Sequence, residues 1–259
     1  MRLYQPLSSA LLALLHLLPL LLLGCASPTA SIHAPEEALS GAWAEASGFP
    51  QAGALGPWEH YVLPAKQATL FSSQRLDGRA ALKANAQSSA SMLRRKLRIE
   101  PEALGSLRFS WLVESLIAQS DMGDRDTDDS PVRIVLAFDG DRSQFSQRNA
   151  MLSELALMLT GEPMPYATLM YSWCKTRESG QTIVNPRTDR IRTLIVESGS
   201  QGLGRWKDYV RDVRADYQAA FGEAPGALVA IGVMTDADNT RSQAVAWYGP
   251  LQLEPPRSP

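Results

Sequence analysis

The sequence contains few cysteines and few histidines. Two of its 259 residues are cysteine and three are histidine. With so few cysteines, a fold stapled by several disulfides is excluded, and stability must come from a hydrophobic core. Once an N-terminal signal is removed, only His33 and His60 remain, which disfavours both a histidine zinc site and a Ser-His-Asp triad.

An excess of positive charge is also missing. The formal net charge is -2 at pH 7, so no basic face is available, and we expect no nucleic-acid partner. The sequence has no Walker loop and no G-x-S-x-G elbow, and the glycines of SGSQGLGRWK lack the final glycine of a dinucleotide fingerprint. The composition, 45% hydrophobic and 20% charged, is ordinary for a globular protein with a packed core.

The N-terminus has the pattern of an export signal. Arg2 precedes a leucine-rich stretch that His16 and Pro19 interrupt, and no basic residues follow it, so we expect a secretory signal and no membrane span. We predict that residues 1–24 are a lipoprotein signal peptide. Residues 25–56, rich in Ala, Ser, Pro and Gly, are predicted to be the lipidated N-terminus and a flexible tether.

Residues 22–25, Leu-Leu-Gly-Cys, resemble the lipobox of bacterial lipoproteins, in which the signal is cut before a cysteine that receives a diacylglycerol. The resemblance implies lipidation at Cys25, and two or three acyl chains give durable membrane anchoring. By the sorting rule of such lipoproteins, Ala26 implies the outer membrane of the cell envelope, with the domain facing the periplasm. A plain signal peptide cut elsewhere is the alternative.

Residues 57–254 have the pattern of a single β domain. Short segments rich in branched and aromatic residues alternate with turn signals, and residues such as Phe109, Trp111 and Val113 share one strand face. About ten such segments predict a mainly β fold, a jelly-roll-like antiparallel β-sandwich with two packed α-helices. The helices are predicted at residues 148–161, with Leu152, Leu155, Ala156 and Leu159 on one stripe, and at 205–222.

Several longer motifs support a family resemblance. They are ASMLRRKL, DDSPVRIVLAFDGD, MPYATLMYSW, NPRTDRIRTLIVESG, RDVRADYQAAFGEAPG and MTDADNT followed by AWYGP. Through them the stretch from Trp58 to Leu253 resembles the bacterial family named domain of unknown function 3047, which implies domain boundaries and no established activity. The closing AWYGPLQL is more distantly similar to galactose-binding-like jelly rolls and carbohydrate-binding modules.

The densest polar feature is an acidic run. Five carboxylates repel one another unless a cation or arginines neutralise them, and calcium prefers such oxygen ligands. The run is not an EF-hand, because Asp129 replaces the required glycine and Val135 the bidentate glutamate. A calcium loop of another kind is one interpretation, and a solvated loop paired with Arg125 and Arg133 is the other. The metal candidates are Asp121, Asp124, Asp126, Asp128 and Asp129.

A second polar cluster lies between two predicted strands. It could be an ordinary turn or a ligand-binding rim, and if both acidic loops lie at one end of the sandwich they could form one site. Aromatic residues could stack on sugar rings, although their alternation also fits core packing. The candidate ligand-binding residues are Asp236, Asp238, Asn239, Thr240, Tyr171 and Trp173.

Three functions are consistent with these features. The favoured one is a lipid-anchored envelope protein that binds a carbohydrate or another polar ligand through loops at one end of the sandwich. The second is a glycoside hydrolase, which needs two carboxylates from a set such as Glu154, Glu162, Glu197, Asp236 and Asp238. The third is a structural or assembly lipoprotein that docks a protein partner.

Overall fold

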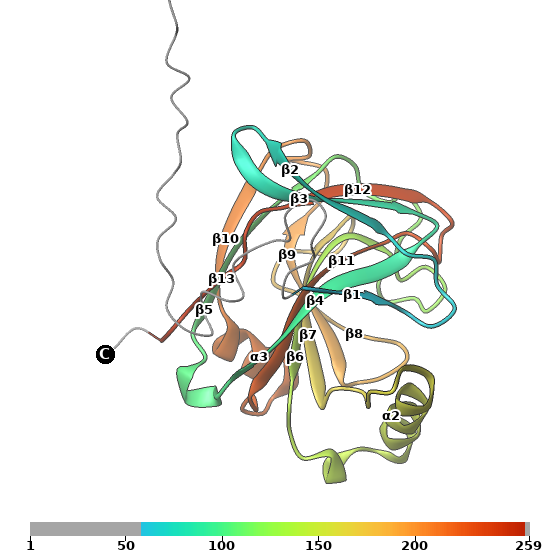
Figure 1. Ribbon diagram of the computed structural model, residues 1–259, viewed down its shortest axis with the longest axis vertical. Helices are drawn as coiled ribbons and strands as arrows, with labels where there is room; N and C mark the ends of the chain where they lie inside the picture. The colour runs from blue at the N-terminus through green and yellow to red at the C-terminus, as the bar shows by residue number, and fades with distance from the viewer. Residues whose placement is uncertain (1–57, 257–259) are drawn as a thin grey trace, which may run out of the picture. The chain divides into compact units, whose positions relative to one another are not determined.

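The computed structural model describes residues 58–256, which form two β-sheets packed face to face (Figure 1). Sheet A has seven strands, in the order β1 (Glu59–Val62), β4 (Ala90–Ile99), β11 (Leu228–Asp236), β6 (Ser130–Phe138), β7 (Ala167–Cys174), β9 (Ile191–Ser198) and β8 (Thr182–Val184). Sheet B has the order β10 (Lys207–Asp212), β5 (Ser106–Val113), β12 (Gln243–Tyr248), β3 (Arg79–Gln87) and β2 (Leu70–Leu76), and β13 (Gln252–Glu254) also pairs with β5.

The predicted jelly-roll-like sandwich is confirmed. The chain passes between the sheets after β1, β3, β4, β5, β9, β10 and β11, so strands that are consecutive in the sequence wrap around one core. The strand pairs are antiparallel with one exception: β7 and β9 are parallel, so sheet A is mixed. Between β7 and β9 the chain forms β8, which pairs with the edge of β9 that faces away from β7.

The core between the sheets follows the alternation in the sequence. Ile134 and Leu136 on β6 face Phe109 and Trp111 on β5, and all four side chains are buried. The rings of Phe109 and Tyr171, one from each sheet, stack with centroids 5.6 Å apart. Each such buried side chain contributes about 1.5–3 kcal/mol relative to exposure, so these stacked rows hold the two sheets together.

The predicted C-terminal helix is shorter than expected. Helix α3 covers Val213–Phe221, and the residues before it form strand β10, with alternating burial and six partners along β5. The expectation of a helix from residue 205 is therefore wrong for 205–212. Tyr209 packs on Phe109 at 5.2 Å, and Asp212 caps the helix by accepting the Ala215 amide, so the strand gives way to a helix at Asp212.

Helix α2 (Gln147–Thr160) is present, but its packing face differs from the predicted stripe. Its buried residues are Asn149 and Ser153, whereas Leu155 and Leu159 are exposed. Leu152 and Ala156 are half-buried, so the predicted stripe is right for these two residues and wrong for the other two. Two short 3-10 helices, η1 (Pro101–Ala103) and η2 (Arg142–Gln144), complete the elements.

The predicted signal peptide, the lipidation of Cys25 and the tether lie outside the described residues. Within residues 58–256, no helix is long and apolar enough to cross a membrane. Cys174 is free and buried at the end of β7.

Candidate functional site

A pocket of about 380 Å³ lies on the outer face of sheet A, the face turned away from sheet B. Along β6 the even-numbered residues point into the core, so Arg133 and Val135 point outward. Arg133 lies opposite Met234 of β11, and Val135 lies opposite Met170 of β7. The middle of the sheet therefore forms the floor of the pocket.

This floor is apolar and rich in methionine. Met234 packs with Ala90 and Val135, and Leu63, Met92 and Met170 pack against that group. Methionine side chains are unbranched and polarizable, so they adapt to ligands of irregular shape. Leu152 of α2 also lines the pocket, which makes the helix one of its walls.

A buried arginine occupies the polar side of the pocket. The Arg133 Nε donates to Asp236 Oδ1 at 3.1 Å, and its Nη2 donates to Asp236 Oδ2 at 3.2 Å and to Asp128 Oδ1 at 2.8 Å. Its side chain is only 4% exposed. Because hydrogen bonds fill the fork of the guanidinium, the two carboxylates are held in a fixed geometry.

Burial controls the ionisation of this cluster. Loss of solvation outweighs the attraction of Arg133 and raises the pKa of Asp236 to about 7. Burial by itself would lower the pKa of Arg133, but the charges of Asp236 and Asp128 outweigh it, and the pKa of Arg133 is raised. The guanidinium therefore stays charged, while Asp236 gains a proton close to neutral pH.

The two acidic loops meet beside this cluster. Asp129 is fully buried and accepts hydrogen bonds from the Asn239 amide at 3.1 Å, the Thr240 amide at 2.7 Å and the Thr240 hydroxyl at 2.6 Å. The Asn239 side-chain amide in turn donates to the Arg125 carbonyl at 3.1 Å. Both loops therefore lie at one end of the sandwich, as the prediction of a single site requires.

More exposed polar side chains form the rim. Lys66, from the loop after β1, makes an ion pair with Asp238. On the other side, Asn185 donates to Asp128 at 3.0 Å and Arg187 approaches Asp128 at 3.8 Å. The rim therefore offers amide, ammonium, guanidinium and carboxylate groups to a ligand.

The aspartates predicted to bind calcium do not gather into one group in the described residues. Asp128 binds Arg133, Asp129 holds the turn at 239–240, and Asp121 pairs with Arg177 at 2.6 Å. Asp124 accepts the backbone amide of Asp126 at 3.0 Å. Nowhere in residues 58–256 do three or more metal-binding side chains gather in a way that could hold an ion. Arg133 and Arg177 pair with two of the aspartates and backbone amides donate to two others, so Arg177 takes the place of the expected Arg125.

The predicted ligand-binding residues divide into two groups. Asp236, Asp238 and Asn239 line the pocket, and Thr240 supports them from behind through Asp129. Tyr171 and Trp173 do not reach it, because they point to the opposite face of β7. Both are fully buried, with Tyr171 donating to Asp216 at 2.8 Å and Trp173 to the Gly199 carbonyl at 2.8 Å. Their proposed role as stacking platforms is wrong.

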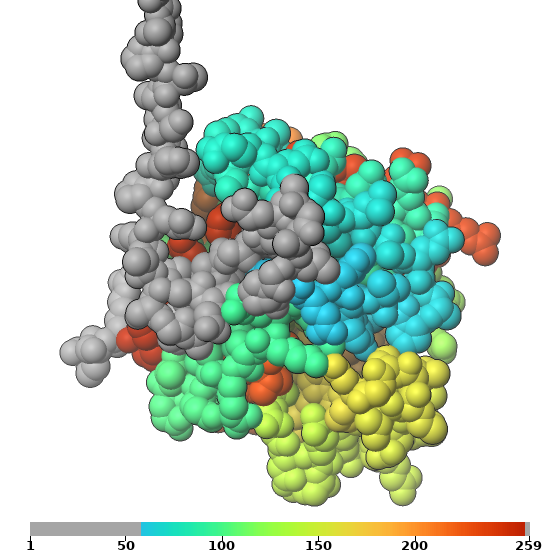
Figure 2. Space-filling view, viewed as in Figure 1, coloured from blue at the N-terminus to red at the C-terminus, as the bar shows by residue number. Residues whose placement is uncertain are grey.

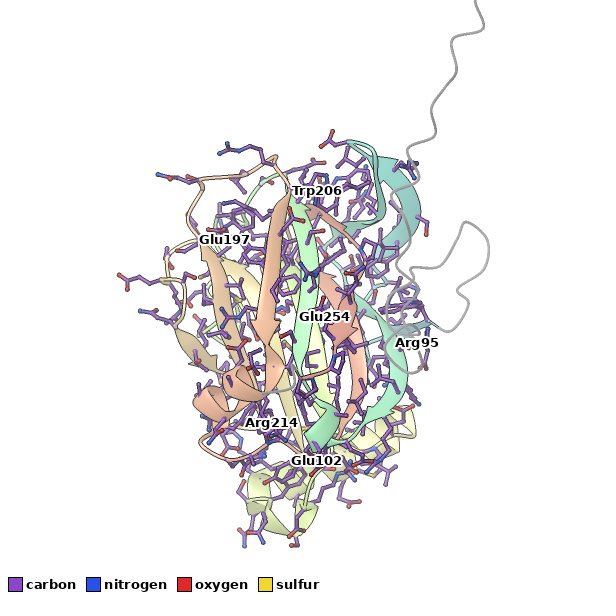
Figure 3. The ribbon with its side chains drawn as sticks, turned by 90° about the vertical axis from the view of Figure 1, so that its left-hand side faces the viewer. Arg95, Glu102, Glu197, Trp206, Arg214 and Glu254 are labelled. Carbon is purple, nitrogen blue, oxygen red and sulfur yellow. The ribbon has the colours of Figure 1, made fainter. Side chains whose placement is uncertain are left out.

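The glutamates considered for hydrolysis lie away from the pocket. Glu197 on β9 accepts from Tyr209 at 2.8 Å on neighbouring β10, along the side of the sandwich shown in Figure 3. Glu162 pairs with Arg94 at 2.8 Å, and Glu154 is exposed on α2. The three carboxylates that do line the pocket, Asp128, Asp236 and Asp238, are each engaged by a cation.

Sequence reasoning missed several residues of the pocket. Arg133 was considered only as a counter-ion, although a single charge inside the apolar strand VRIVLAF is itself a signal of a buried ion pair. Lys66, Asn185 and Arg187 come from loops far apart in the sequence, and no local pattern distinguishes them. Their role depends on the way the sheets bring those loops together.

A family model described as "Protein of unknown function (DUF3047)" matches residues 56–252. The chain belongs to this family. The match covers the loops of the pocket and the strands of both sheets up to the first residue of β13, so the site lies within the family domain. No curated protein matches the sequence at a significant level.

Three solved structures are similar to this DUF3047 chain at low identity. A mutant carbohydrate-binding module of family 29 is 12% identical, with 80% of this chain and 87% of that chain covered and a TM-score of 0.32. The xyloglucanase domain of NopAA from Sinorhizobium fredii, in complex with cellobiose, is 8% identical over 76% and 92%, with a TM-score of 0.38. The family 11 xylanase of Neocallimastix patriciarum is 8% identical over 77% and 92%, with a TM-score of 0.35.

Proposed function

We propose that this protein is a lipid-anchored envelope protein that binds a small polar ligand, a carbohydrate in the first instance, in the pocket on the outer face of sheet A. The observation that carries this proposal is the Arg133 cluster. It is a preorganised group of charges at the side of a pocket whose floor is apolar. Ligand pockets typically combine a mostly apolar lining with a few fixed polar groups.

The cost of burying these charges supports a role in binding. Removing three charged groups from water costs several kcal/mol per ion, and apolar residues of similar volume are often as stabilising in such a place. Arg133, Asp128 and Asp236 taken together therefore contribute little stability that apolar residues at all three positions could not, although the loss of one partner alone is costly. A fixed set of donors and acceptors beside an open pocket is consistent with a cluster kept for recognition.

The chemistry of the lining suits a sugar ring. The rings of sugars have CH faces and hydroxyl edges, so they need an apolar surface together with planar donors and acceptors. Met170 and Met234 offer the first, while Asn185, Arg187 and Asn239 offer the second. Since none of the described lining residues is aromatic, the apolar contact is with methionine and leucine.

The ion pair between Lys66 and Asp238 at the rim is weak enough for a ligand to displace. Lys66 is 37% exposed, and a surface ion pair of this kind contributes only about 0–1 kcal/mol. A ligand hydroxyl can therefore take the place of Lys66 as the partner of Asp238, or of Asp238 as the partner of Lys66, at a small cost in free energy. We infer that a ligand that enters the pocket from this side displaces the pair.

Membrane anchoring is proposed to occur through Cys25. The support comes from the lipobox-like sequence and from the cysteine count, since the second cysteine, Cys174, is buried and free. A buried thiol at a strand end is unsuited to carrying an acyl chain. The ligand pocket would then be held on the periplasmic side of the outer membrane.

A thermal-shift screen of the purified mature protein against envelope glycans tests ligand binding. We expect one glycan class to raise the melting temperature, because a ligand that binds only the folded state stabilises it. Asp238→Asn in the rim should weaken that shift. Asp208→Asn, an exposed carboxylate on sheet B, is the matched control and should leave it unchanged. A shift that Asp238→Asn does not alter would place binding elsewhere, and no shift with any glycan would exclude a carbohydrate.

A further inference from the structure

Helix α2 turns its apolar side chains outward. Its inward face carries Asn149, Ser153 and Thr160, whereas Met158 is 75% exposed and Met151 is 65% exposed. This arrangement reverses the usual pattern, in which the apolar stripe of a surface helix faces the core. Figure 2 shows the helix at the surface of the domain, with its outer side open.

The orientation of the helix is fixed by specific contacts. The side-chain amide of Asn149 donates to Asp189 at 2.7 Å, and its carbonyl accepts from the buried Thr188 hydroxyl at 2.8 Å. Ser146 caps the N-terminus, and Gly161 closes the C-terminus with a left-handed φ of 76°. Rotation that buried the apolar stripe would break the contacts of Asn149 and bury Glu154, so the exposed stripe is the stable arrangement.

The exposed apolar residues are concentrated on this helix. Five of the nine large hydrophobic side chains exposed in residues 58–256 belong to α2, namely Met151, Leu155, Leu157, Met158 and Leu159. The other four are scattered over β1, β2, β8 and β10. Single exposed hydrophobics are normal, but Met151, Leu155, Met158 and Leu159 share one face of the helix by their spacing, and such a group marks an interaction surface.

We propose that the occupant of this surface is the lipid bilayer, with α2 lying in the interface of the membrane to which the chain is anchored. This inference rests on the proposed anchoring at Cys25. A helix of 14 residues is about 21 Å long, too short to span a bilayer but suited to lying along its surface. Leucine and methionine on one face are the side chains that enter the acyl boundary of such an interface.

The length of chain between the anchor and the domain favours the membrane over other occupants. Only 32 residues, 26–57, separate Cys25 from Trp58, and even a fully extended chain of that length spans at most about 110 Å. The bilayer is therefore always within reach of α2, at a high effective concentration. A helix whose own membrane affinity is weak then binds as the second of two membrane contacts.

The consequence concerns the ligand pocket. Leu152, on the inward side of α2, lines that pocket, so a bilayer contact on the outward side brings the pocket close to the membrane surface. Ligands presented at the membrane, such as the sugar headgroup of a glycolipid, would reach it more readily than ligands free in solution.

The mature lipidated protein, reconstituted into vesicles of phosphatidylethanolamine and phosphatidylglycerol, tests the proposal. In the variant Met158→Cys, a polarity-sensitive fluorophore is attached to the new thiol. In the matched control, Ser72→Cys, the same fluorophore is attached at an exposed position on β2 of sheet B. Cys174 is buried, so the new thiol is the site of labelling. We expect a blue shift and several-fold stronger quenching by a lipid-borne quencher at Met158→Cys and neither effect at Ser72→Cys. Equal emission at the two positions would overturn the proposal.

Two further readouts separate the possible failures. If the protein does not float with vesicles at all, the anchoring fails; if it floats but Met158→Cys stays in a polar environment, only the α2 contact fails. The double variant Leu155→Glu with Met158→Glu changes exposed positions, so circular dichroism should be unchanged while the contact is lost. A concentration-dependent dimer without vesicles, abolished by the same variant, would instead assign this face to a second copy of the chain.

Discussion

Asp128, in the loop before β6, and Asp236, the last residue of β11, accept hydrogen bonds from the same Nη2 atom of Arg133, at 2.8 and 3.2 Å. This relationship links the end of the acidic run with the end of β11. It places both carboxylates beside one pocket and determines which of the polar residues in the sequence act together.

Replacing Arg133 with methionine should destabilise the domain strongly. The variant leaves two buried carboxylates without their cation, and breaking a buried pair in this way costs about 3–5 kcal/mol. Urea unfolding measures the change. The control is Arg79→Met, because Arg79 pairs with Asp208 at the exposed surface and its loss should cost about 0–1 kcal/mol. Equal effects of the two substitutions would contradict the view that Arg133 is buried and indispensable.

The stability of the domain should depend on pH through Asp236. Its pKa in the folded protein is about 7, raised by burial from an ordinary value of 3.8, so the folded state binds the proton more tightly. Its contribution is fully present below pH 3.8 and is lost as the pH rises through 7. Asp236→Asn, which cannot ionise, should remove this part of the pH dependence. Denaturant unfolding from pH 4 to 8 for both proteins checks it, and parallel curves would refute the assignment.

Calcium should not stabilise the protein. Arginines and backbone amides bind four of the five aspartates of the acidic run, and no group of three or more of these side chains forms within residues 58–256. We expect the same melting temperature with saturating calcium and with chelator, because only a ligand that binds the folded state raises it. A calcium-dependent rise that disappears in Asp124→Asn would show that the run binds the ion after all.

Replacing Asp129 should loosen the turn at residues 239–240, which forms part of the pocket wall. Asp129→Ala removes the acceptor of three hydrogen bonds from the half-buried residues Asn239 and Thr240, and a hydrogen bond of this kind contributes about 0.5–1.5 kcal/mol. Amide hydrogen exchange should then accelerate at Asn239 and Thr240 more than in the strands of sheet B. A uniform change across the domain would indicate global destabilisation without a local role.

Cys25→Ser should release the protein from membranes. Without the thiol no diacylglycerol can be attached, and a single weak contact such as α2 gives only marginal binding. Fractionation of cells should move the variant from the membrane to the soluble envelope fraction, and Cys174→Ser should stay with the membrane. Mass spectrometry of the N-terminus provides an independent check, since a mature chain that begins at any other residue contradicts lipidation.

The strands were predictable because alternation is a local property. The alternation in the sequence predicts that Ile134 and Leu136 share one strand face, and so do Phe109 and Trp111. In the structure all four side chains belong to the core. At Lys207–Asp212 the same kind of reasoning failed, since Tyr209 and Val210 fit a helical stripe as well as a strand. Pairing with β5 decided between the two, and no local pattern contains that information.

Periodicity and composition act over a few neighbouring residues, so they were enough to predict a mainly β sandwich and to locate the two acidic loops. Long-range packing was needed to show that Arg133 joins the two loops, that Tyr171 and Trp173 belong to the core, and that α2 points its methionines outward. Each of these depends on which distant segment lies opposite. The packing of whole sheets sets that neighbourhood, because burying apolar area outweighs the preferences of any single turn or helix.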